Sequence, residues 1–348
     1  MKKKLLQFLF FFVVMGLTIY AVFQGNDLNE VMTAVHGMNK FWLIPAAILA
    51  VLFVMCEGIM IRDLLRLLGH ENSLIRCFSY SFIGYFYSGI TPSASGGQPL
   101  QLYYMNQDGN NLSDSSVVLL TVAFFSRIVL TVIGIFLLIF THGWLLTYFQ
   151  GYMFVYYLGL ILNTLVAAGI LGVMVAPQVV LKIANGVDTL LVKMRILKRS
   201  PERRVKIVNF VDGYKGAVNF LIRHKEKIAY LFFFTLLQRV TLYVLTWFVY
   251  KGFGLSGAGF FKVIFLQAAI YVSVEMLPLP GAQGITELLY HNVFGAIFGS
   301  FLTPSLLVVR GLDFYMLMLV SLVFVLYRFF RTKRITSLPG RTSSGEAK

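Results

Sequence analysis

Six long apolar runs alternate with polar segments along the chain. Each run is close to or longer than the roughly 20 residues that a helix needs to cross the hydrocarbon core of a bilayer. Helices satisfy their own backbone hydrogen bonds in lipid, so we expect an all-α, polytopic integral membrane protein. The predicted spans are 5–23, 41–61, 113–140, 152–176, 228–250 and 303–330.

The stretch 88–101 interrupts this pattern with small and polar residues between two apolar limbs. It contains the pair Gly96-Gly97, and Pro92 and Pro99 each remove a backbone donor and break a regular helix. The limbs, 77–90 and 100–105, are too short to span. A surface turn is the ordinary interpretation of such a cluster. Because irregular backbone at membrane depth must face protein or a water-filled cavity, we predict a re-entrant helical hairpin instead.

A second polar break, 278–287, lies between the apolar limbs 260–277 and 288–301. These limbs are longer, so a pair of true spans is an alternative to a second hairpin. When the basic loops are placed in the cytoplasm, the first hairpin starts and ends inside and the second starts and ends outside. Oppositely oriented broken helices are typical of inverted repeats, in which the breaks meet near the midplane and form a substrate site.

Composition supports a membrane protein, because 58% of the residues are hydrophobic and only 13% are charged. The net charge of +15 is concentrated at the termini and in 177–227, where twelve Lys or Arg accompany four Asp or Glu. We predict that 177–227 is a basic amphipathic segment on the cytoplasmic surface. A tRNA-binding surface is the alternative, but no aromatic interleaving supports it. This charge pattern predicts a multi-pass protein of the cell membrane with both termini in the cytoplasm.

The domain organisation is simple. We expect one transmembrane domain over 1–335 and a disordered Gly/Ser-rich tail over 336–348. The basic flank 2–4 and the lack of a cleavage pattern predict that the first span is a retained anchor. The two cysteines, Cys56 and Cys77, provide neither a disulfide framework nor a metal-site spacing.

Seven ionisable residues fall inside apolar segments, where each costs about 2.5–3.5 kcal/mol on insertion scales. They should therefore face one another or water. One interpretation is structural ion pairing, for example Arg310 with Asp313 at i,i+3, or Arg127 with Glu57 or Glu287. The other is a polar cavity in which forked arginine donors hold a lipid phosphate. The seven residues are Glu57, Arg127, Arg239, Glu275, Glu287, Arg310 and Asp313.

The candidate binding residues come from the two breaks and the helices near them. Arg127 and Arg310 lead because each lies on the helix after a broken segment, and we expect Gly96 and Gly97 to offer free backbone donors to a phosphate. Glu275 and Glu287 bracket the second break and are candidates to accept a cationic headgroup or a coupling proton. The predicted substrate-binding residues are Thr91, Ser93, Ser95, Gly96, Gly97, Gln98, Gln101, Arg127, Arg239, Glu275, Gln283, Glu287, Arg310 and Asp313.

Signatures of catalysis are not evident in the sequence. It contains no Ser-His-Asp set at usable spacing, no Walker loop and no dinucleotide fingerprint. We therefore expect no catalytic residues, no cofactor and no metal.

The strings Thr91-Pro-Ser-Ala-Ser-Gly-Gly-Gln-Pro99 and Pro280-Gly-Ala-Gln-Gly-Ile-Thr-Glu287 resemble the lysylphosphatidylglycerol synthase transmembrane-region family, the flippase-like membrane domain of the multiple peptide resistance factor. The resemblance covers about residues 5–330, and the family often has a Gly-Gly pair where this chain has Gly281-Ala282. It implies a lipid flippase core. In full-length relatives a cytoplasmic acyltransferase-like domain follows. This chain ends about 18 residues past its last predicted helix, so we expect that domain to be absent.

The resemblance and the residues together predict a flippase that moves an anionic or aminoacylated phospholipid, or a related lipid, between leaflets, and not an enzyme on its own. An alternative is the membrane part of a phosphatidylglycerol lysyltransferase, or of another lipid-modifying transferase, that acts with a separately encoded soluble partner. A third interpretation is a structural subunit for such a transferase. The expected partners are membrane phospholipid, the soluble transferase and a second copy of the chain, whereas nucleic acid is not expected.

Overall fold

The computed structural model describes residues 28–91, 95–176, 201–277 and 279–336, with short pieces at 178–179, 181–182, 185–186, 189 and 193. The described residues form helices joined by turns, with no strand among them. The prediction of an all-α polytopic membrane protein is therefore confirmed. The predicted first span, 5–23, and the tail after residue 336 lie outside the described residues.

Five stretches of the described chain are long and apolar enough to cross a membrane: Lys40–Leu67, Leu112–Phe140, Met153–Val175, Glu226–Gly252 and Ile285–Phe330. The last is not a single rod, because Gly299 turns the chain with φ 54° between two helices. Its second part is the predicted final span. The span predicted over 41–61 is longer in the structure and continues as a helix to Leu67.

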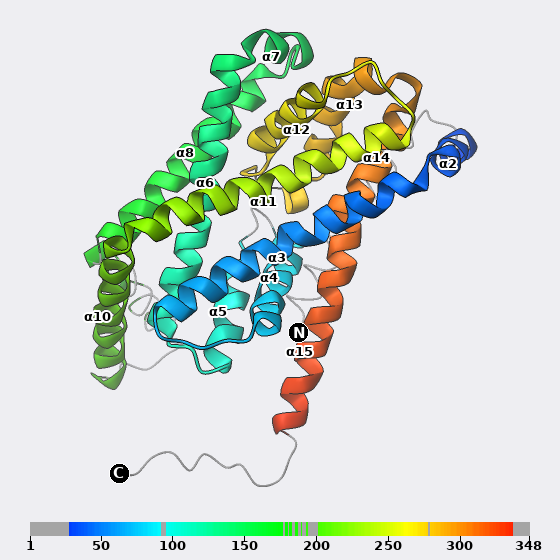
Figure 1. Cartoon of the computed structure of the whole chain (residues 1–348). Coiled ribbons are helices and arrows are strands. Elements are labelled where there is room, and N and C mark those ends of the chain that lie inside the picture. Colours follow the sequence, from blue (N-terminus) through cyan, green and yellow to red (C-terminus); the bar gives the residue numbers. More distant parts are fainter. Residues whose placement is uncertain are drawn as a thin grey trace.

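Successive long helices run in opposite directions through the molecule (Figure 1). The end that carries α7 (His142–Tyr148), uppermost in Figure 1, is named the α7 end, and the opposite one the α5 end. Two helices, α6 (Leu112–Phe140) and α11 (Lys225–Gly252), run toward the α7 end. Those that run toward the α5 end are α3 (Leu43–Leu67), α8 (Met153–Val175) and the continuous series α14 (Leu302–Arg310), η5 (Gly311–Met316) and α15 (Leu317–Thr336).

Two short helical hairpins fill the space between the long helices. The first, α4 (Leu74–Gly89) and α5 (Gly97–Gln107), has both outer ends at the α5 end. The second, α12 (Phe260–Val274) and α13 (Ile285–Phe298) with η3 (Pro280–Ala282) between them and η4 (Gly299–Phe301) after, has both outer ends at the α7 end. Limbs of 16, 11, 15 and 14 residues are each shorter than the roughly 20 needed to span. The opposed hairpins are therefore as predicted, and the membrane side that each end faces stays a prediction.

The first break is shorter than the sequence pattern indicates. α5 begins at Gly97, so Gln98 and Gln101 are helical and do not belong to an irregular centre. Pro99 lies in the first turn of α5, where a backbone N–H has no hydrogen-bond acceptor within the helix, so the N–H that proline lacks is not missed. The proline therefore starts a helix here, whereas the sequence analysis took it as a break.

Two further helices lie at the ends of the molecule. α2 (Leu28–Gly37) and η1 (Lys40–Trp42) precede α3 at the α7 end. At the α5 end, α10 (Pro201–Arg223) packs on α6, where the Ser113 hydroxyl donates to the Phe210 carbonyl at 2.9 Å and Tyr214 is buried. Residues 201–223 of the basic segment 177–227 thus form a docked helix, whereas most of 177–200 lies outside the described residues.

Two apolar cores are stacked along the long axis of the molecule. The core nearer the α7 end includes Val54 on α3, Leu130 on α6 and Leu242 on α11. The core nearer the α5 end resumes on the same three helices at Met60, Phe125 and Leu231. Between these positions lie Glu57, Arg127 and Arg239. A polar layer therefore separates the two cores at mid-depth.

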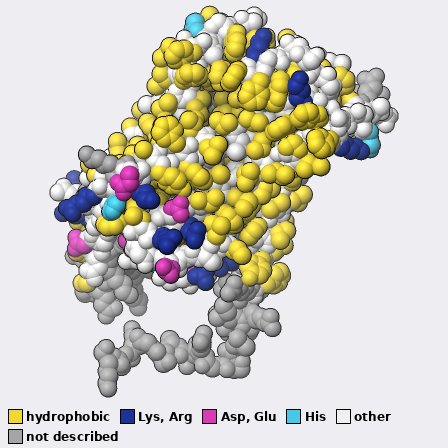
Figure 2. Space-filling model, in the orientation of Figure 1, with side chains coloured by type: hydrophobic (Ala, Val, Ile, Leu, Met, Phe, Trp, Pro, Cys, Tyr) yellow, Lys and Arg dark blue, Asp and Glu magenta, His cyan; other side chains and the backbone are white. Residues whose placement is uncertain are grey.

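The outside of the bundle is apolar. Figure 2 shows hydrophobic side chains over most of the face between the two ends, with charged side chains gathered mainly near the α5 end. Large side chains such as Phe154, Ile139 and Leu319 are about two-thirds or more exposed, at 73%, 67% and 66%. Such a surface fits lipid and would be unfavourable in water.

Candidate functional site

A cavity of about 450 Å³ lies in the polar layer, where the two breaks approach each other. The first break and α5 contribute Ser95, Gln98 and Gln101 to its wall, and the second contributes Gly281 and Ala282. The sequence analysis predicted that the intramembrane charges would face one another or water. Six of those seven residues line this one cavity: Glu57, Arg127, Arg239, Glu275, Arg310 and Asp313.

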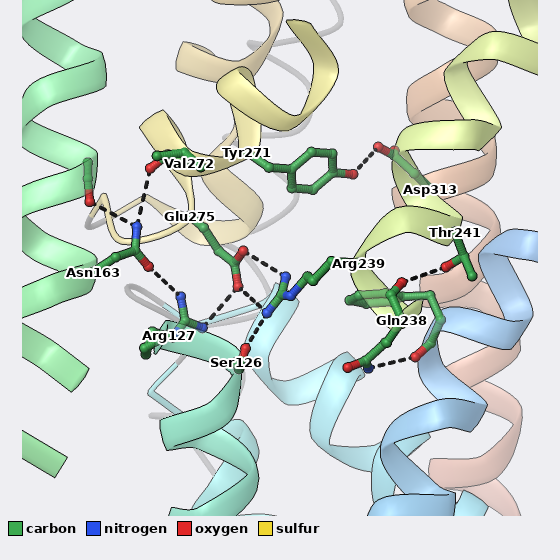
Figure 3. Close-up of polar contacts among 12 residues, drawn as sticks. Ser126, Arg127, Asn163, Gln238, Arg239, Thr241, Tyr271, Val272, Glu275 and Asp313 are labelled. Carbon is green, nitrogen blue, oxygen red and sulfur yellow. Dashed lines mark hydrogen bonds and ion pairs between the residues drawn. The ribbon is translucent and has the colours of Figure 1, made fainter. Parts of the chain in front are cut away.

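One carboxylate holds two arginines at the centre of the layer (Figure 3). Glu275 Oε1 accepts from Arg127 Nη2 at 2.9 Å and from Arg239 Nη2 at 3.0 Å, and Glu275 Oε2 accepts from Arg239 Nη1 at 2.7 Å. These three residues form the Arg–Glu–Arg triad. Arg127 therefore pairs with Glu275, and the expected partners Glu57 and Glu287 were wrong.

Neighbouring polar groups fix both guanidinium groups of the triad. Arg127 Nη1 donates to Asn163 Oδ1 at 3.2 Å, and Arg239 Nη2 also donates to the Ser126 hydroxyl. Asn163 is itself anchored, because its amide donates to the Val272 carbonyl at 3.2 Å and to the Gly159 carbonyl at 2.8 Å. The triad is thus held by α6, α8, α11 and the end of α12.

The backbone of α8 touches the backbone of α12 beside the triad. A Cβ at Gly159 would lie 2.4 Å from the carbonyl oxygens of Val272 and Ser273. Only glycine permits this approach, because every other residue has a Cβ there. The contact brings Asn163, one turn further along α8, to Val272 and sets the position of Glu275.

A second charged cluster joins the second break to the last helix. Arg310 Nε donates to Glu287 Oε1 at 2.7 Å, and Arg310 Nη2 donates to the Gly281 carbonyl at 3.1 Å. The predicted i,i+3 pair with Asp313 is present at 3.8 Å but is longer than the bond to Glu287. Asp313 also accepts from the Tyr271 hydroxyl at 2.8 Å.

Asp313 contacts both hairpins from a π-helical segment. Its carboxylate accepts a hydrogen bond from the Tyr271 hydroxyl of α12, and its backbone carbonyl accepts one from the Tyr85 hydroxyl of α4 at 2.7 Å. The π-helix, η5, is a rare geometry that is frequent at functional sites. It places one residue where the two hairpins meet.

Glu57 and Gln101 form a separate polar pair on the cavity wall. Gln101 Nε2 donates to Glu57 Oε1 at 2.6 Å, from α5 to α3. Gly84 makes room for this amide, since a Cβ there would lie 2.3 Å from Gln101 Nε2. Among the described residues, no Lys or Arg lies within ion-pair distance of Glu57, in contrast to Glu275 and Glu287.

The first break is closed by its own hydrogen bonds. Thr91 Oγ1 accepts from the Gly96 N–H at 2.9 Å and donates to the Tyr87 carbonyl at 2.6 Å. The expectation that Gly96 offers a free donor is therefore wrong for this conformation. Gly97 is buried against α4, where a Cβ would meet the Gly84 carbonyl at 2.6 Å, so its role is close packing of the hairpin.

The remaining predicted residues divide into three groups. Ser95 and Gln98 are exposed and line the cavity. Gln283 is 2% exposed and does not line the cavity. Glu287 does not line the cavity either, but it binds Arg310, which does. Ser93 lies outside the described residues.

Sequence reasoning missed several residues that build this layer. Asn163 is a lone amide in the apolar run 152–176, which is a signal that could have found it. Ser126 precedes Arg127 directly, but a hydroxyl beside a charge is too common to be informative. Tyr85 and Tyr271 could not be distinguished by sequence from the many other tyrosines of the chain.

Comparison with protein families gives one match. The model described as lysylphosphatidylglycerol synthase TM region matches residues 5–321 of the chain. No curated protein matches the chain. The family description indicates that the chain has a role related to membrane lipid.

Proposed function

Because this chain belongs to the lysylphosphatidylglycerol synthase transmembrane-region family, we propose that it is a flippase for a phospholipid, anionic or aminoacylated like lysylphosphatidylglycerol. The observation that carries the proposal is the Arg–Glu–Arg triad beside an open cavity at mid-depth. Two guanidinium groups share one carboxylate, so the triad has an excess of one positive charge. Arginine binds phosphate through forked donors, and a lipid headgroup supplies that phosphate.

The energetics of the layer favour a function beyond simple packing. Each buried charge costs about 2.5–3.5 kcal/mol at the centre of a spanning helix. A buried ion pair is often no more stable than apolar residues of similar volume. Six such residues around one cavity are therefore a costly way to join helices, and they make a suitable surface for a charged headgroup.

The cavity is shaped for one polar and one apolar part of the same ligand. Its volume of about 450 Å³ lies within the range of about 300–1,000 Å³ typical of small-molecule sites. Its lining combines polar side chains such as Gln98 and Gln101 with the apolar Val166 and Leu279, which are 38% and 41% exposed. A headgroup in the cavity would thus have its acyl chains beside the lipid-facing surface.

The opposed hairpins provide a route for exchange between leaflets. Broken helices that meet near the midplane are the usual framework of alternating-access transporters. Here Tyr85 of the first hairpin and Tyr271 of the second bind the same residue, Asp313, at the cavity. A change in the pairing at this level would therefore reach both hairpins.

The test is leaflet exchange by purified protein in vesicles that contain fluorescent phosphatidylglycerol or its lysylated form. We expect Arg127→Gln to lower the exchange rate by about 10- to 100-fold, since one charge-assisted hydrogen bond contributes about 1.5–3 kcal/mol. Arg127→Lys should rescue poorly, because a lysine lacks the fork. Arg328→Gln is the matched control: Arg328 is also buried and paired, with Asp108 at 2.6 Å, but lies away from the cavity.

Three outcomes would contradict the proposal. Full exchange by a stable Arg127→Gln protein would remove the triad from the site. Synthesis of lysylated lipid by this chain with lysyl-tRNA and phosphatidylglycerol alone would show that the chain itself has the activity that the family description names, and the flippase-only proposal would be wrong. If lysylated lipid forms only with a soluble partner, and no exchange occurs without it, the partner-subunit interpretation holds instead.

A further inference from the structure

A line of buried polar residues continues from the triad toward the α7 end. On α11 these residues are Arg239, Tyr243 and Thr246, and on the antiparallel α12 they are Glu275, Tyr271 and Gln267. Arg239 binds Glu275, and the rings of Tyr243 and Tyr271 lie 5.6 Å apart. Thr246 lies about one turn beyond Tyr243 on α11, and Gln267 lies about one turn beyond Tyr271 on α12. We name Tyr243, Thr246, Gln267 and Tyr271 the α11–α12 seam.

Three groups of the seam have no hydrogen-bond partner among the described residues. They are the Tyr243 hydroxyl, the Thr246 hydroxyl and Gln267 Oε1. Tyr243, Thr246 and Gln267 are only 2%, 0% and 2% exposed. A buried polar atom without a partner is destabilising, and native proteins keep few of them. They lie in one line that begins at the cavity, so water or a headgroup that entered the seam would give all three a hydrogen-bond partner.

The seam lies between two pairs of packed helices, α3 with α11 and α8 with α12, and α6 contacts both pairs. α11 packs along α3, where Gln238 Nε2 donates to the Phe53 carbonyl at 2.8 Å and Trp42 stacks on Phe248 at 5.8 Å. α12 packs on α8 through the backbone contact at Gly159. Packed helix pairs have discrete arrangements relative to each other, so a movement of one pair against the other would take place at the seam.

Polar and aromatic contacts join the two helices at both ends of the seam. At the cavity, Arg239 of α11 binds Glu275. At the α7 end, Trp247 meets Phe260 edge to face at 5.4 Å, and the Tyr250 hydroxyl accepts from the Ala258 N–H at 2.7 Å. The first contact is ionic and can be exchanged for another anion, whereas the aromatic contacts can separate without leaving charge unpaired.

We propose that the α11–α12 seam is the closed half of the headgroup path, and that it opens toward the α7 end when a lipid phosphate replaces Glu275 on Arg127 and Arg239. This inference rests on the proposed flippase function. A ligand shifts such an equilibrium only if it binds one conformation more tightly than the other. The phosphate binds the open conformation more tightly, because in the closed one the Glu275 carboxylate, which joins α12 to α11, competes with it for the arginines. Once released from the arginines, Glu275 no longer joins α12 to α11. The hydroxyl and amide groups of the seam then bind the lipid headgroup as the headgroup moves toward the α7 end.

The first test measures access to the seam. Thr246→Cys is made in a background in which the buried Cys56 and Cys77 are replaced by alanine, and an impermeant methanethiosulfonate reagent is added to either face of vesicles. During exchange of phosphatidylglycerol we expect modification from the α7 side to be faster by about tenfold or more than without that lipid, as for a minor state that becomes populated. Modification should also stop exchange. The control is Ser273→Cys, an equally buried hydroxyl position on the face of α12 that packs on α8.

The second test distinguishes a role of the seam residues in stability from a role in the passage of the headgroup. In the otherwise unchanged chain, the double substitution Thr246→Val and Gln267→Leu should raise the Tm, because it removes unpartnered polar atoms, and should slow exchange by about tenfold or more. A lower Tm, or an unchanged rate of exchange, would overturn the inference. So would equal modification of Thr246→Cys and Ser273→Cys. If the unmodified chain moves no lipid, the proposed flippase function is wrong. If it moves lipid but the seam variants behave as the controls do, only the inference about the seam is wrong.

Discussion

The backbone contact between α8 and α12 gives a sharp prediction for Gly159→Ala. The new Cβ would lie 2.4 Å from two carbonyl oxygens and 2.6 Å from Ser273 Cα, whereas ordinary contact begins at 3.4 Å. The helices must therefore separate by about 1 Å. All of the opposing atoms belong to the backbone, so no rotamer change relieves the contact. Overpacking of this kind costs typically 1–3 kcal/mol, and we expect the upper part of that range, about 3 kcal/mol.

The same displacement should reach the site. Asn163 donates to Val272 at 3.2 Å and would lose this bond if α8 moved by about 1 Å, since hydrogen bonds weaken beyond about 3.5 Å. Asn163 would then no longer fix Arg127 against Glu275. We expect lipid exchange to fall together with stability, although the substitution adds no charge and removes no polar group.

The assay compares the Tm and the rate of lipid exchange of Gly159→Ala with those of Gly172→Ala. Gly172 lies on the same helix, and a Cβ there would meet nothing within 4 Å. A Tm lower by roughly 5 °C for the first variant, and unchanged or slightly higher for the second, is the expected result. If Gly159→Ala keeps the Tm and the exchange rate of the unmodified chain, the helices do not approach as closely as described, and the account of how the triad is positioned fails.

Two more predictions concern the breaks and the topology. Ala282 has φ 51°, a left-handed conformation that costs an L-residue about 1–2 kcal/mol, so Ala282→Gly should raise stability by up to about 1 kcal/mol in thermal unfolding; a lower Tm would contradict it. Cysteines at the exposed positions Glu71 and Gln107 should react from one face of the membrane, and those at Ser256 and Ser300 from the other. Reaction of Glu71→Cys and Gln107→Cys from opposite faces would turn the first hairpin into a span.

The sequence predicts the framework of this site well, for physical reasons. Apolar run length predicts the spanning helices and the first hairpin, because the bilayer sets the length. For the longer limbs 260–277 and 288–301 it left a pair of true spans open. The cost of charge in lipid likewise predicts that Arg127, Arg239 and Glu275 must find partners. These are constraints that act on each segment separately, and they can therefore be recognised without knowledge of the fold.

The pairing could not be predicted in the same way. Arg127 and Glu275 are 148 positions apart, and several acids satisfied the requirement for a partner equally well. Which acid is used depends on the approach of α8 to α12 at Gly159, a tertiary contact that no local pattern reports. The misplaced break at Pro99 has the opposite cause, because a local rule was applied without knowing that the residue opens a helix.

The long separation within the triad also has a consequence for biosynthesis. Arg127 enters the membrane with α6, but Glu275 is made 148 residues later. At about 5–20 residues per second, this guanidinium waits roughly 7–30 s for its carboxylate. During this interval the strongly apolar α6 must hold the charge in the membrane without its carboxylate partner. Assembly of the polar layer is thus a late event, completed when the second hairpin folds between helices that are already inserted.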